Sequence, residues 1–255
     1  MIKIFKIIFK DILKNKTILF FLLILILMSW ISFLMEDDVY KGLIMVMNEV
    51  LFVVPLMAIL FTTVYVYNSK DLIILLLGQP IERKMIWRGI YMGVSVSLCA
   101  SFLCGAGLPI LIFAPDITGI IMLLMGLGIT LVFVSLSFLI SSFVVDKSKG
   151  IGVALVVWLF FSIIYDGLML FIVFQFSDYP IDNMMIVLLM LNPVDLSRLQ
   201  ILMQLDVSAI MGYAGAVFRN LLGTTAGTIV SAIDIILWII LPYYVSVRIF
   251  QKKDL

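Results

Sequence analysis

Thr17-Ile-Leu-Phe-Phe-Leu-Leu-Ile-Leu-Ile-Leu-Met-Ser-Trp-Ile-Ser-Phe-Leu-Met35 is a run of 19 residues without a charge. A helix of about 20 apolar residues crosses the ~30 Å hydrocarbon core of a bilayer, so this run predicts a membrane-spanning helix. The rest of the chain is similar in character, because 64% of its 255 residues are hydrophobic and only 13% are charged. A soluble domain is about half apolar and a quarter charged. The sequence therefore predicts an integral membrane protein.

Six stretches have the length and composition of a membrane-spanning helix. They are residues 17–35, 50–67, 89–113, 118–144, 151–175 and 224–247. A helix in lipid pairs its backbone polar groups internally, so we expect an all-α, polytopic membrane protein in which residues 1–255 form a single domain. The first run is longer than the apolar part of a signal peptide, and no small-residue cleavage site follows it. We therefore expect it to remain as a spanning helix.

Basic residues are distributed unevenly between the two sides of this arrangement. Fourteen of the 17 Lys and Arg residues fall on one side: Lys3, Lys6, Lys10, Lys14, Lys16, Lys70, Arg83, Lys84, Arg88, Lys147, Lys149, Arg248, Lys252 and Lys253. The other side has Lys41, Arg198 and Arg219, and it is rich in acid: Glu36, Asp37, Asp38, Glu49, Asp116, Asp178, Asp182, Asp195 and Asp206. Cytoplasmic loops carry the excess of Lys and Arg. The bias predicts that both termini lie in the cytoplasm.

The residues before the first span form a separate element. Four lysines, at positions 3, 6, 10 and 14, share one helical stripe, whereas Ile4, Ile8 and Ile12 lie away from it. This spacing predicts an amphipathic helix in the cytoplasmic interface of the membrane. The alternative is a frayed start of the first span with lysines that reach out to the headgroups.

A cytoplasmic segment, residues 69–84, contains an apolar run that is too short to span. The run covers residues 72–77, and Gly78 and Pro80 predict its end. A short apolar helix on this side needs a cover, either the headgroup region or a groove on a partner protein.

The segment between the fifth and sixth spans, residues 176–223, is longer than a simple connection requires. Its apolar pieces are divided by Asn192-Pro193 and by Asp206. Asn-Pro followed by Asp195 predicts a helix start with an acidic first turn. We expect short helices on the outer side, which either dock an extracytoplasmic partner or form a lid that packs on its own bundle.

Two carboxylates lie inside predicted spans, Asp166 in the fifth and Asp234 in the sixth. A carboxylate at a helix centre costs ~2.5–3.5 kcal/mol on insertion scales, so such residues usually face a bundle interior or a wet cavity. Their positions predict a similar depth and a shared polar pocket, either at the bundle core or at a subunit seam. That pocket would belong either to a substrate path or to a structural hydrogen bond.

Several functional classes are excluded by what the sequence lacks. It contains no histidine and no phosphate-binding loop of the G-x-x-x-x-G-K-[ST] type, so we expect no catalytic machinery, no cofactor and no ATP hydrolysis by this chain. Cys99 and Cys104 are interpreted as small buried hydrophobes, and the 16 methionines show no clustered metal-binding pattern. The spacings Gly89/Gly93 and Gly223/Gly227 permit close helix contacts.

The segment between the second and third spans resembles a known family. Leu75-Leu76-Leu77-Gly78-Gln79-Pro80-Ile81-Glu82-Arg83 is similar to the coupling-helix region of type-2 ABC transporter permeases, and the six spans and the basic N-terminal helix agree with that family. In it, two permease copies pair and each coupling helix rests on a separate ATPase subunit. The resemblance implies an ATPase-coupling role for Lys70, Asp71, Leu72, Leu75, Leu76, Gln79, Pro80, Glu82, Arg83 and Lys84.

The outer segment resembles one branch of this family, the NosY permeases of the maturation transporter for nitrous oxide reductase. The similarity is carried by Leu191-Asn192-Pro193-Val194-Asp195-Leu196-Ser197-Arg198, by Leu205-Asp206-Val207-Ser208-Ala209 and by Met211-Gly212-Tyr213-Ala214-Gly215-Ala216-Val217-Phe218. It implies that Asn192, Pro193, Asp195, Arg198, Asp206, Met211, Gly212 and Tyr213 face a periplasmic partner or form a lid.

The resemblance also implies partners and a function. The chain would form a homodimer in the bacterial inner membrane, with ATP and magnesium bound by a NosF-like cytoplasmic ATPase and with a NosD-like periplasmic β-helical protein. This complex would serve assembly of the copper–sulfur centre, by export of a sulfur species or by remodelling of the periplasmic partner. The alternatives are an ABC-2 exporter of peptides, antibiotics or lipids and, from another class, a membrane scaffold without transport. No nucleic-acid partner is expected.

Overall fold

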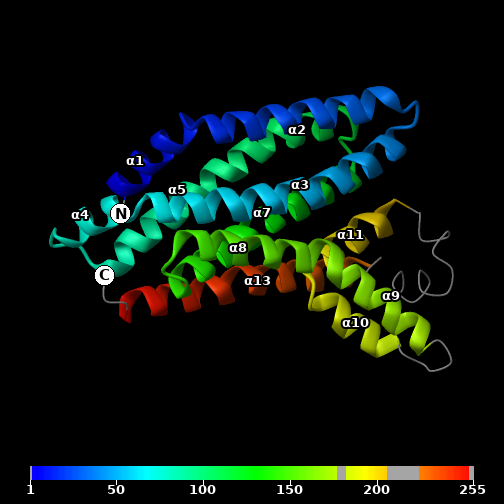
Figure 1. Ribbon diagram of the computed structural model, residues 1–255. Coiled ribbons are helices and arrows are strands. Elements are labelled where there is room, and N and C mark those ends of the chain that lie inside the picture. Colours follow the sequence, from blue (N-terminus) through cyan, green and yellow to red (C-terminus); the bar gives the residue numbers. More distant parts are fainter. Residues whose placement is uncertain (1, 177–181, 206–223, 253–255) are drawn as a thin grey trace.

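The computed structural model describes residues 2–176, 182–205 and 224–252 (Figure 1). Within these ranges the chain is helical apart from short connections, and they contain no strand. The elements in chain order are α1 (Ile2–Leu13), α2 (Lys16–Met35), α3 (Val39–Asn68), α4 (Lys70–Leu77), α5 (Arg83–Phe102), the π-helical segment η1 (Leu103–Gly107), α6 (Leu108–Phe113), α7 (Ile117–Phe143), α8 (Lys147–Leu159), the π-helical segment η2 (Phe160–Ile164), α9 (Tyr165–Gln175), α10 (Asp182–Met190), α11 (Pro193–Gln204) and α13 (Thr225–Lys252).

Six helices in the described part of the chain are long and apolar enough to cross a membrane. They are Lys16–Met35, Val39–Asn68, Arg83–Phe113, Ile117–Phe143, Lys147–Gln175 and Ala226–Lys252. The predicted all-α fold with six spans is confirmed. A further pair, Met184–Met190 and Pro193–Gln204, bends by 111° and has the composition of a broken span or a re-entrant loop. This pair is called the α10–α11 hairpin below.

The second span begins at Val39, much earlier than the predicted residue 50. The side chain of Asp38 accepts a hydrogen bond from the backbone N–H of Tyr40 at 3.0 Å, which is the usual arrangement at a helix N-cap. Glu49, expected in a loop, therefore lies inside α3, where Ser32 Oγ donates to its carboxylate at 2.8 Å. The start of the second span was predicted after the charged residue Glu49. In the structure the helical hydrogen bonds of the backbone begin earlier and include this residue.

Helix α7 lies at the centre of the bundle and packs against α3 and α13. Two-thirds of its most apolar stretch (67%) is buried within the chain, against 11% for the fifth span and 17% for the sixth. Hydroxyl groups join α7 to α3, because Thr63 Oγ1 and Ser137 Oγ lie 2.6 Å apart and Ser137 Oγ donates to the carbonyl of Ile59. The fifth and sixth spans therefore leave apolar faces for lipid or for another protein.

The N-terminal helix α1 is amphipathic, as predicted, and is distinct from the first span. A turn at Asn15 separates it from α2, so the alternative of a frayed span start is wrong. Ile4, Ile8 and Ile12 are buried, whereas Lys6, Lys10 and Lys14 are exposed. Helix α1 packs on α5 at Gly93, where a Cβ would come within 2.5 Å of Ile8. This contact bears out the close packing expected for the Gly89/Gly93 pair.

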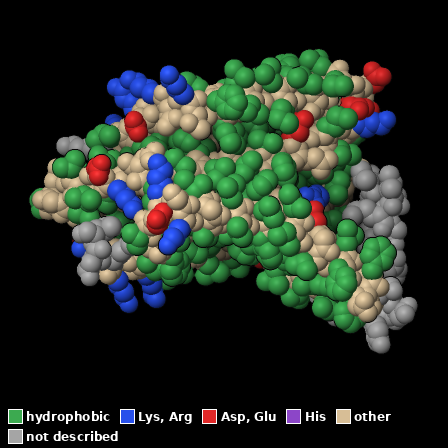
Figure 2. All heavy atoms as spheres, viewed as in Figure 1, with side chains coloured by type: hydrophobic (Ala, Val, Ile, Leu, Met, Phe, Trp, Pro, Cys, Tyr) green, Lys and Arg blue, Asp and Glu red, His purple; other side chains and the backbone are tan. Residues whose placement is uncertain are grey.

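The two ends of the bundle differ in charge. The visible Lys and Arg side chains gather mainly at the end that carries α1, α4 and the end of α13, and apolar side chains cover the flanks (Figures 1 and 2). This end is called the basic end below.

Between the ends, Cys99 is half-buried but Cys104 is exposed, so the prediction that both are buried is wrong for Cys104. Cys104 belongs to η1, and the apolar surface of a membrane protein accepts such a side chain.

Candidate functional site

Helix α4 is a short helix at the basic end, between the second and third spans. Ser69 separates it from α3: its N–H donates to the carbonyl of Tyr65 at 2.9 Å, and its hydroxyl donates to the same carbonyl at 2.8 Å. Helix α4 ends at Leu77 and is followed by Gly78 and Pro80, as the sequence predicted. The break at Ser69 lets this short helix leave the direction of the long α3.

The apolar side chains of α4 face two ways. Ile73 is buried against the bundle, whereas Ile74 is 55% exposed and Leu75 is 71% exposed. Leu76 and Leu77 are partly buried and pack at the edge of the core. An apolar surface on a short helix at a charged end of the protein marks an interaction site. Within the described chain, Leu75 and about half of Ile74 stay uncovered.

The other predicted coupling residues surround this surface. Asp71, Gln79, Pro80, Glu82, Arg83 and Lys84 are exposed, and Lys70 and Leu72 are half-buried. Glu82 is the N-cap of α5, so the segment after Pro80 leads directly into the third span. The predicted residues therefore lie together, but they divide into exposed ones and ones that hold α4 to the bundle.

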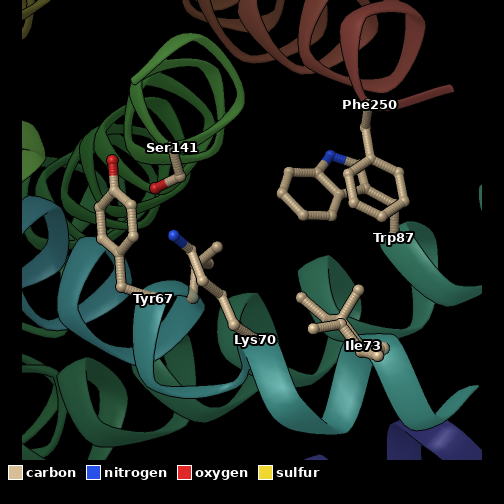
Figure 3. Close-up of a pocket in the computed structure, with 8 residues that line it drawn as sticks. Tyr67, Lys70, Ile73, Trp87, Ser141 and Phe250 are labelled. Carbon is tan, nitrogen blue, oxygen red and sulfur yellow. The ribbon is translucent and has the colours of Figure 1, made fainter. Parts of the chain in front are cut away.

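A cavity of about 80 Å³ lies beneath α4 at the basic end (Figure 3). It is lined by Val66, Tyr67, Lys70, Ile73, Ile74, Trp87, Ser141 and Phe250. These residues come from α3, α4, α5, α7 and α13, so five elements meet at the root of α4. Ser141 Oγ is buried there without a hydrogen-bond partner in the described chain. The root of α4 thus contains a small cavity and an unpaired hydroxyl group.

One set of contacts joins the start of α5 to the end of α13. The rings of Trp87 and Phe250 stack with centroids 4.2 Å apart (Figure 3). Trp87 Nε1 also donates to Ser246 Oγ at 3.2 Å. Arg83 Nη1 donates to the carbonyl of Gln251 at 3.3 Å. These contacts join the start of the third span to the end of the sixth span.

A second set of contacts joins α3 and α4 to the connection between α7 and α8. Tyr67 Oη donates to the carbonyl of Val144 at 2.9 Å, and Lys70 Nζ donates to that of Val145 at 2.6 Å. Asp146 caps α8 and accepts hydrogen bonds from the backbone N–H groups of Lys149 and Ser148, which hold the pKa of its carboxyl below its usual value. These contacts link α4 to the fourth and fifth spans.

Sequence reasoning missed Tyr67, Trp87 and Phe250 as parts of this site. Each is an aromatic residue at the end of a predicted span, a position in which aromatic residues are common for reasons of membrane anchoring. The spacing of these residues along the chain gave no sign that they converge, since they belong to three different helices.

A second group of polar contacts lies at the opposite end of the bundle, where α11 meets the fifth span. Asn192 is the N-cap of α11 and its side chain accepts a hydrogen bond from Val194 N–H at 3.0 Å. Asn192 Nδ2 donates to the carbonyl of Phe161 at 2.9 Å and to Asp195 Oδ2 at 2.6 Å. The carbonyl of Phe161 belongs to η2, where α-helical hydrogen bonding is interrupted.

An ion pair strengthens the same junction. Arg198 Nη1 lies 2.8 Å from Asp166 Oδ2 on α9 and 3.2 Å from Asp195 Oδ1. Within the described part of one chain Asp166 and Asp234 do not share a pocket, because Asp166 lines a cavity of about 310 Å³ with Arg198 and Asp234 lines a different one of about 360 Å³. The expectation of a pocket at the bundle core is therefore wrong, and the alternative of a pocket at a subunit seam stays a prediction. The sequence analysis placed Arg198 on an outer surface and so did not identify it as the partner of Asp166.

The hairpin is also joined to the sixth span. Gln200 Nε2 donates to Thr228 Oγ1 at 3.0 Å, Ser231 Oγ donates to Gln200 Oε1 at 3.0 Å, and Trp238 Nε1 donates to the carbonyl of Met190 at 3.1 Å.

Among the predicted outer residues, Asn192, Pro193 and Asp195 are buried and Arg198 is partly buried. This inward placement favours a lid that packs on its own bundle. The predicted outer residues Asp206, Met211, Gly212 and Tyr213 lie outside the described residues, as does Gly223 of the second Gly pair.

The chain thus combines six spans with an exposed apolar helix at the basic end and a hairpin fastened to the fifth and sixth spans. No group of three His, Cys, Asp or Glu side chains that could hold a metal ion occurs in the described ranges. The model of the ABC-2 family transporter proteins matches residues 41–255. This chain belongs to the ABC-2 transporter family. The match begins in α3, so it includes α4 and every later element of the ABC-2 fold described above.

Two curated sequences are similar to this ABC-2 family member. The probable ABC transporter permease protein NosY of Pseudomonas aeruginosa is 31% identical over 173 residues, which cover 63% of each chain. The protein of the same name from Stutzerimonas stutzeri is 28% identical over 160 residues, which cover 58% of each chain. The chain thus aligns with about three-fifths of the length of these relatives. The resemblance to NosY permeases is confirmed, and the chain is a multi-pass ABC transporter permease.

Proposed function

We propose that this chain is the permease subunit of a transporter that serves assembly of the copper–sulfur centre of nitrous oxide reductase. The two similar proteins named NosY support this choice within the ABC-2 family. The observation that carries the coupling part of the proposal is the uncovered apolar surface of α4, with Leu75 71% exposed. A separate ATPase binds this surface and supplies the energy.

In this proposal the basic end lies in the cytoplasm, because it holds most of the Lys and Arg residues. Two copies of the chain pair in the inner membrane, and the poorly buried fifth and sixth spans offer apolar area for that pairing. A NosF-like ATPase binds ATP and magnesium beneath each copy. A NosD-like periplasmic protein acts at the opposite end, where the chain exports a sulfur species or changes the state of this partner.

The side-chain contacts define a mechanical route for coupling. Motion of α4 passes to α13 through the Trp87–Phe250 stack and to α8 through the contacts of Tyr67 and Lys70. Helix α8 continues through η2 into α9, and π-helical segments often occur at hinges and functional sites. The Arg198–Asp166 ion pair then passes the motion from α9 to the α10–α11 hairpin.

Deletion of the gene in its own host tests the proposed substrate system. We expect nitrous oxide reductase to be made and exported but to lack its copper–sulfur centre, so that nitrous oxide accumulates during denitrification. Absorption spectra and copper content of the purified reductase measure this, and reintroduction of the wild-type gene is the control. A complete centre in the deletion strain contradicts the proposal. Hypersensitivity to a peptide or antibiotic with a complete centre assigns the chain to the exporters of those compounds.

A further inference from the structure

The described part of the chain contains an apolar pocket that the proposed coupling route does not use. It lies between α10 and α13 and has a volume of about 360 Å³, which is within the usual size range of small-molecule sites. Its apolar walls are formed by Val187, Met190, Leu191, Leu237, Trp238 and Leu241. Asp234 and Pro242 complete the lining, so a single ionisable side chain faces an otherwise apolar space.

Asp234 lacks a partner within the described chain. Its Oδ2 atom is buried and accepts no hydrogen bond from any described residue. No Lys or Arg lines the pocket, and Arg198, which lies on α11, is already paired with Asp166 and Asp195. A charged carboxylate in such surroundings is costly unless it meets a counter-charge or a donor, and without either one it takes up a proton. The described residues supply neither one in this pocket.

Pro242 interrupts the backbone hydrogen bonding of α13 at the pocket. A proline inside a helix has no N–H, and the carbonyl four residues earlier loses its hydrogen bond; here that carbonyl belongs to Trp238. The indole N–H of Trp238 is already used, because it donates to the carbonyl of Met190 at 3.1 Å. Among the described side chains the lining of the pocket therefore offers a carboxylate and an aromatic wall, and Trp238 has no free N–H on its indole ring.

We propose that this pocket binds an amphipathic organic ammonium ion, with the ammonium group on Asp234 and the hydrocarbon part against the apolar walls. An ammonium supplies both a positive charge and N–H donors, so it matches the charge and the unpaired oxygen of Asp234. The indole ring of Trp238 adds favourable contact with a cation. The inference concerns a ligand class and is independent of the proposed role in copper–sulfur assembly.

The test uses two fluorescent probes that differ in one group. Dansylcadaverine carries a primary ammonium, and N-acetyl-dansylcadaverine has the same body with a neutral amide in its place. Both are titrated against the full chain in nanodiscs of phosphatidylcholine and phosphatidylglycerol, which contain no primary amine. We expect saturable binding of dansylcadaverine, with at least tenfold weaker binding of the acetylated probe. Equal binding of the two probes overturns the proposal, and this comparison needs no variant.

A matched pair of variants locates the site. Asp234→Asn keeps the size of the side chain and removes its charge, and we expect at least a tenfold loss of dansylcadaverine affinity. Glu49→Gln removes a different carboxylate within a span, where Ser32 already donates to it, and we expect unchanged affinity. An unchanged affinity in Asp234→Asn overturns the proposal and indicates that Asp234 is neutral and needs no cation.

A third arm distinguishes two sources of the ammonium group. Nanodiscs that also contain phosphatidylethanolamine present the same group on a membrane lipid. Weaker apparent binding of dansylcadaverine in these nanodiscs supports the site with a lipid headgroup as its occupant. Unchanged binding supports the site with a separate amphipathic amine as its occupant.

Discussion

Replacing Leu75 by glutamate is expected to abolish stable association of this permease with its ATPase. Leu75 is 71% exposed on α4, and burial of such a side chain in a partner groove contributes about 1.5–3 kcal/mol. Its loss alone weakens binding by about tenfold to a hundredfold, and a carboxylate in an apolar groove weakens it further. Co-purification with the ATPase and ATP turnover of the complex in nanodiscs measure the effect.

Two further variants make this result specific. Ile7→Glu changes a similarly exposed apolar residue of α1, 63% exposed at the same end of the bundle, and it should leave ATPase association intact. Leu75→Ala should give an intermediate loss, because it removes apolar area without adding a charge. If Leu75→Glu retains the wild-type affinity for the ATPase, α4 is not the coupling element.

Replacing Arg198 by methionine is expected to destabilise the outer end of the bundle and to stop transport. Methionine keeps much of the apolar length of arginine, but Asp166 and Asp195 then lie near each other without their counter-charge. Both ends of the ion pair are about a third exposed, so we expect about 2 kcal/mol rather than the 3–5 kcal/mol typical of a fully buried pair. For a chain of this size that corresponds to a Tm lower by roughly 4–8 °C in detergent.

The cause of this loss can be separated from the loss of side-chain packing. Arg198→Lys keeps the charge but gives up the planar fork that meets two carboxylates, so its Tm should fall between those of the wild type and Arg198→Met. Adding Asp166→Asn and Asp195→Asn to Arg198→Met removes the repulsion and should restore most of the lost Tm. No recovery in this triple variant would show that the ion pair is not the source of stability.

The sequence was sufficient to predict the fold because bilayer thickness and backbone pairing leave few alternatives for long apolar runs. The lysine stripe of α1 and the breaks at Gly78 and Asn192-Pro193 also had local causes that could be read directly. The predicted coupling residues lie together because they are consecutive in the chain. Their division into exposed and anchoring side chains needed the structure, since it depends on which side of α4 meets the bundle.

The rest of the site could not be predicted because it is formed by distant segments. Trp87 and Phe250 are 163 positions apart in the chain, and nothing in their local sequence couples them. Asp166 follows η2, where a π-helical segment changes the register of the helix, and its partner Arg198 lies in a segment predicted to form short helices on the outer side. The prediction compared the depths of the two carboxylates in the membrane and therefore placed Asp166 beside Asp234. In the structure Asp166 instead forms an ion pair with Arg198.

The side of the membrane on which α4 lies decides whether a cytoplasmic ATPase can reach it. In a background with Cys99→Ala and Cys104→Ala, Leu75→Cys and Asp37→Cys place single thiols at exposed positions at the basic end and in the connection between α2 and α3. Intact spheroplasts are then treated with a membrane-impermeant maleimide. Our account predicts labelling of Asp37→Cys at once and of Leu75→Cys only after lysis. Labelling of Leu75→Cys in intact spheroplasts would contradict it.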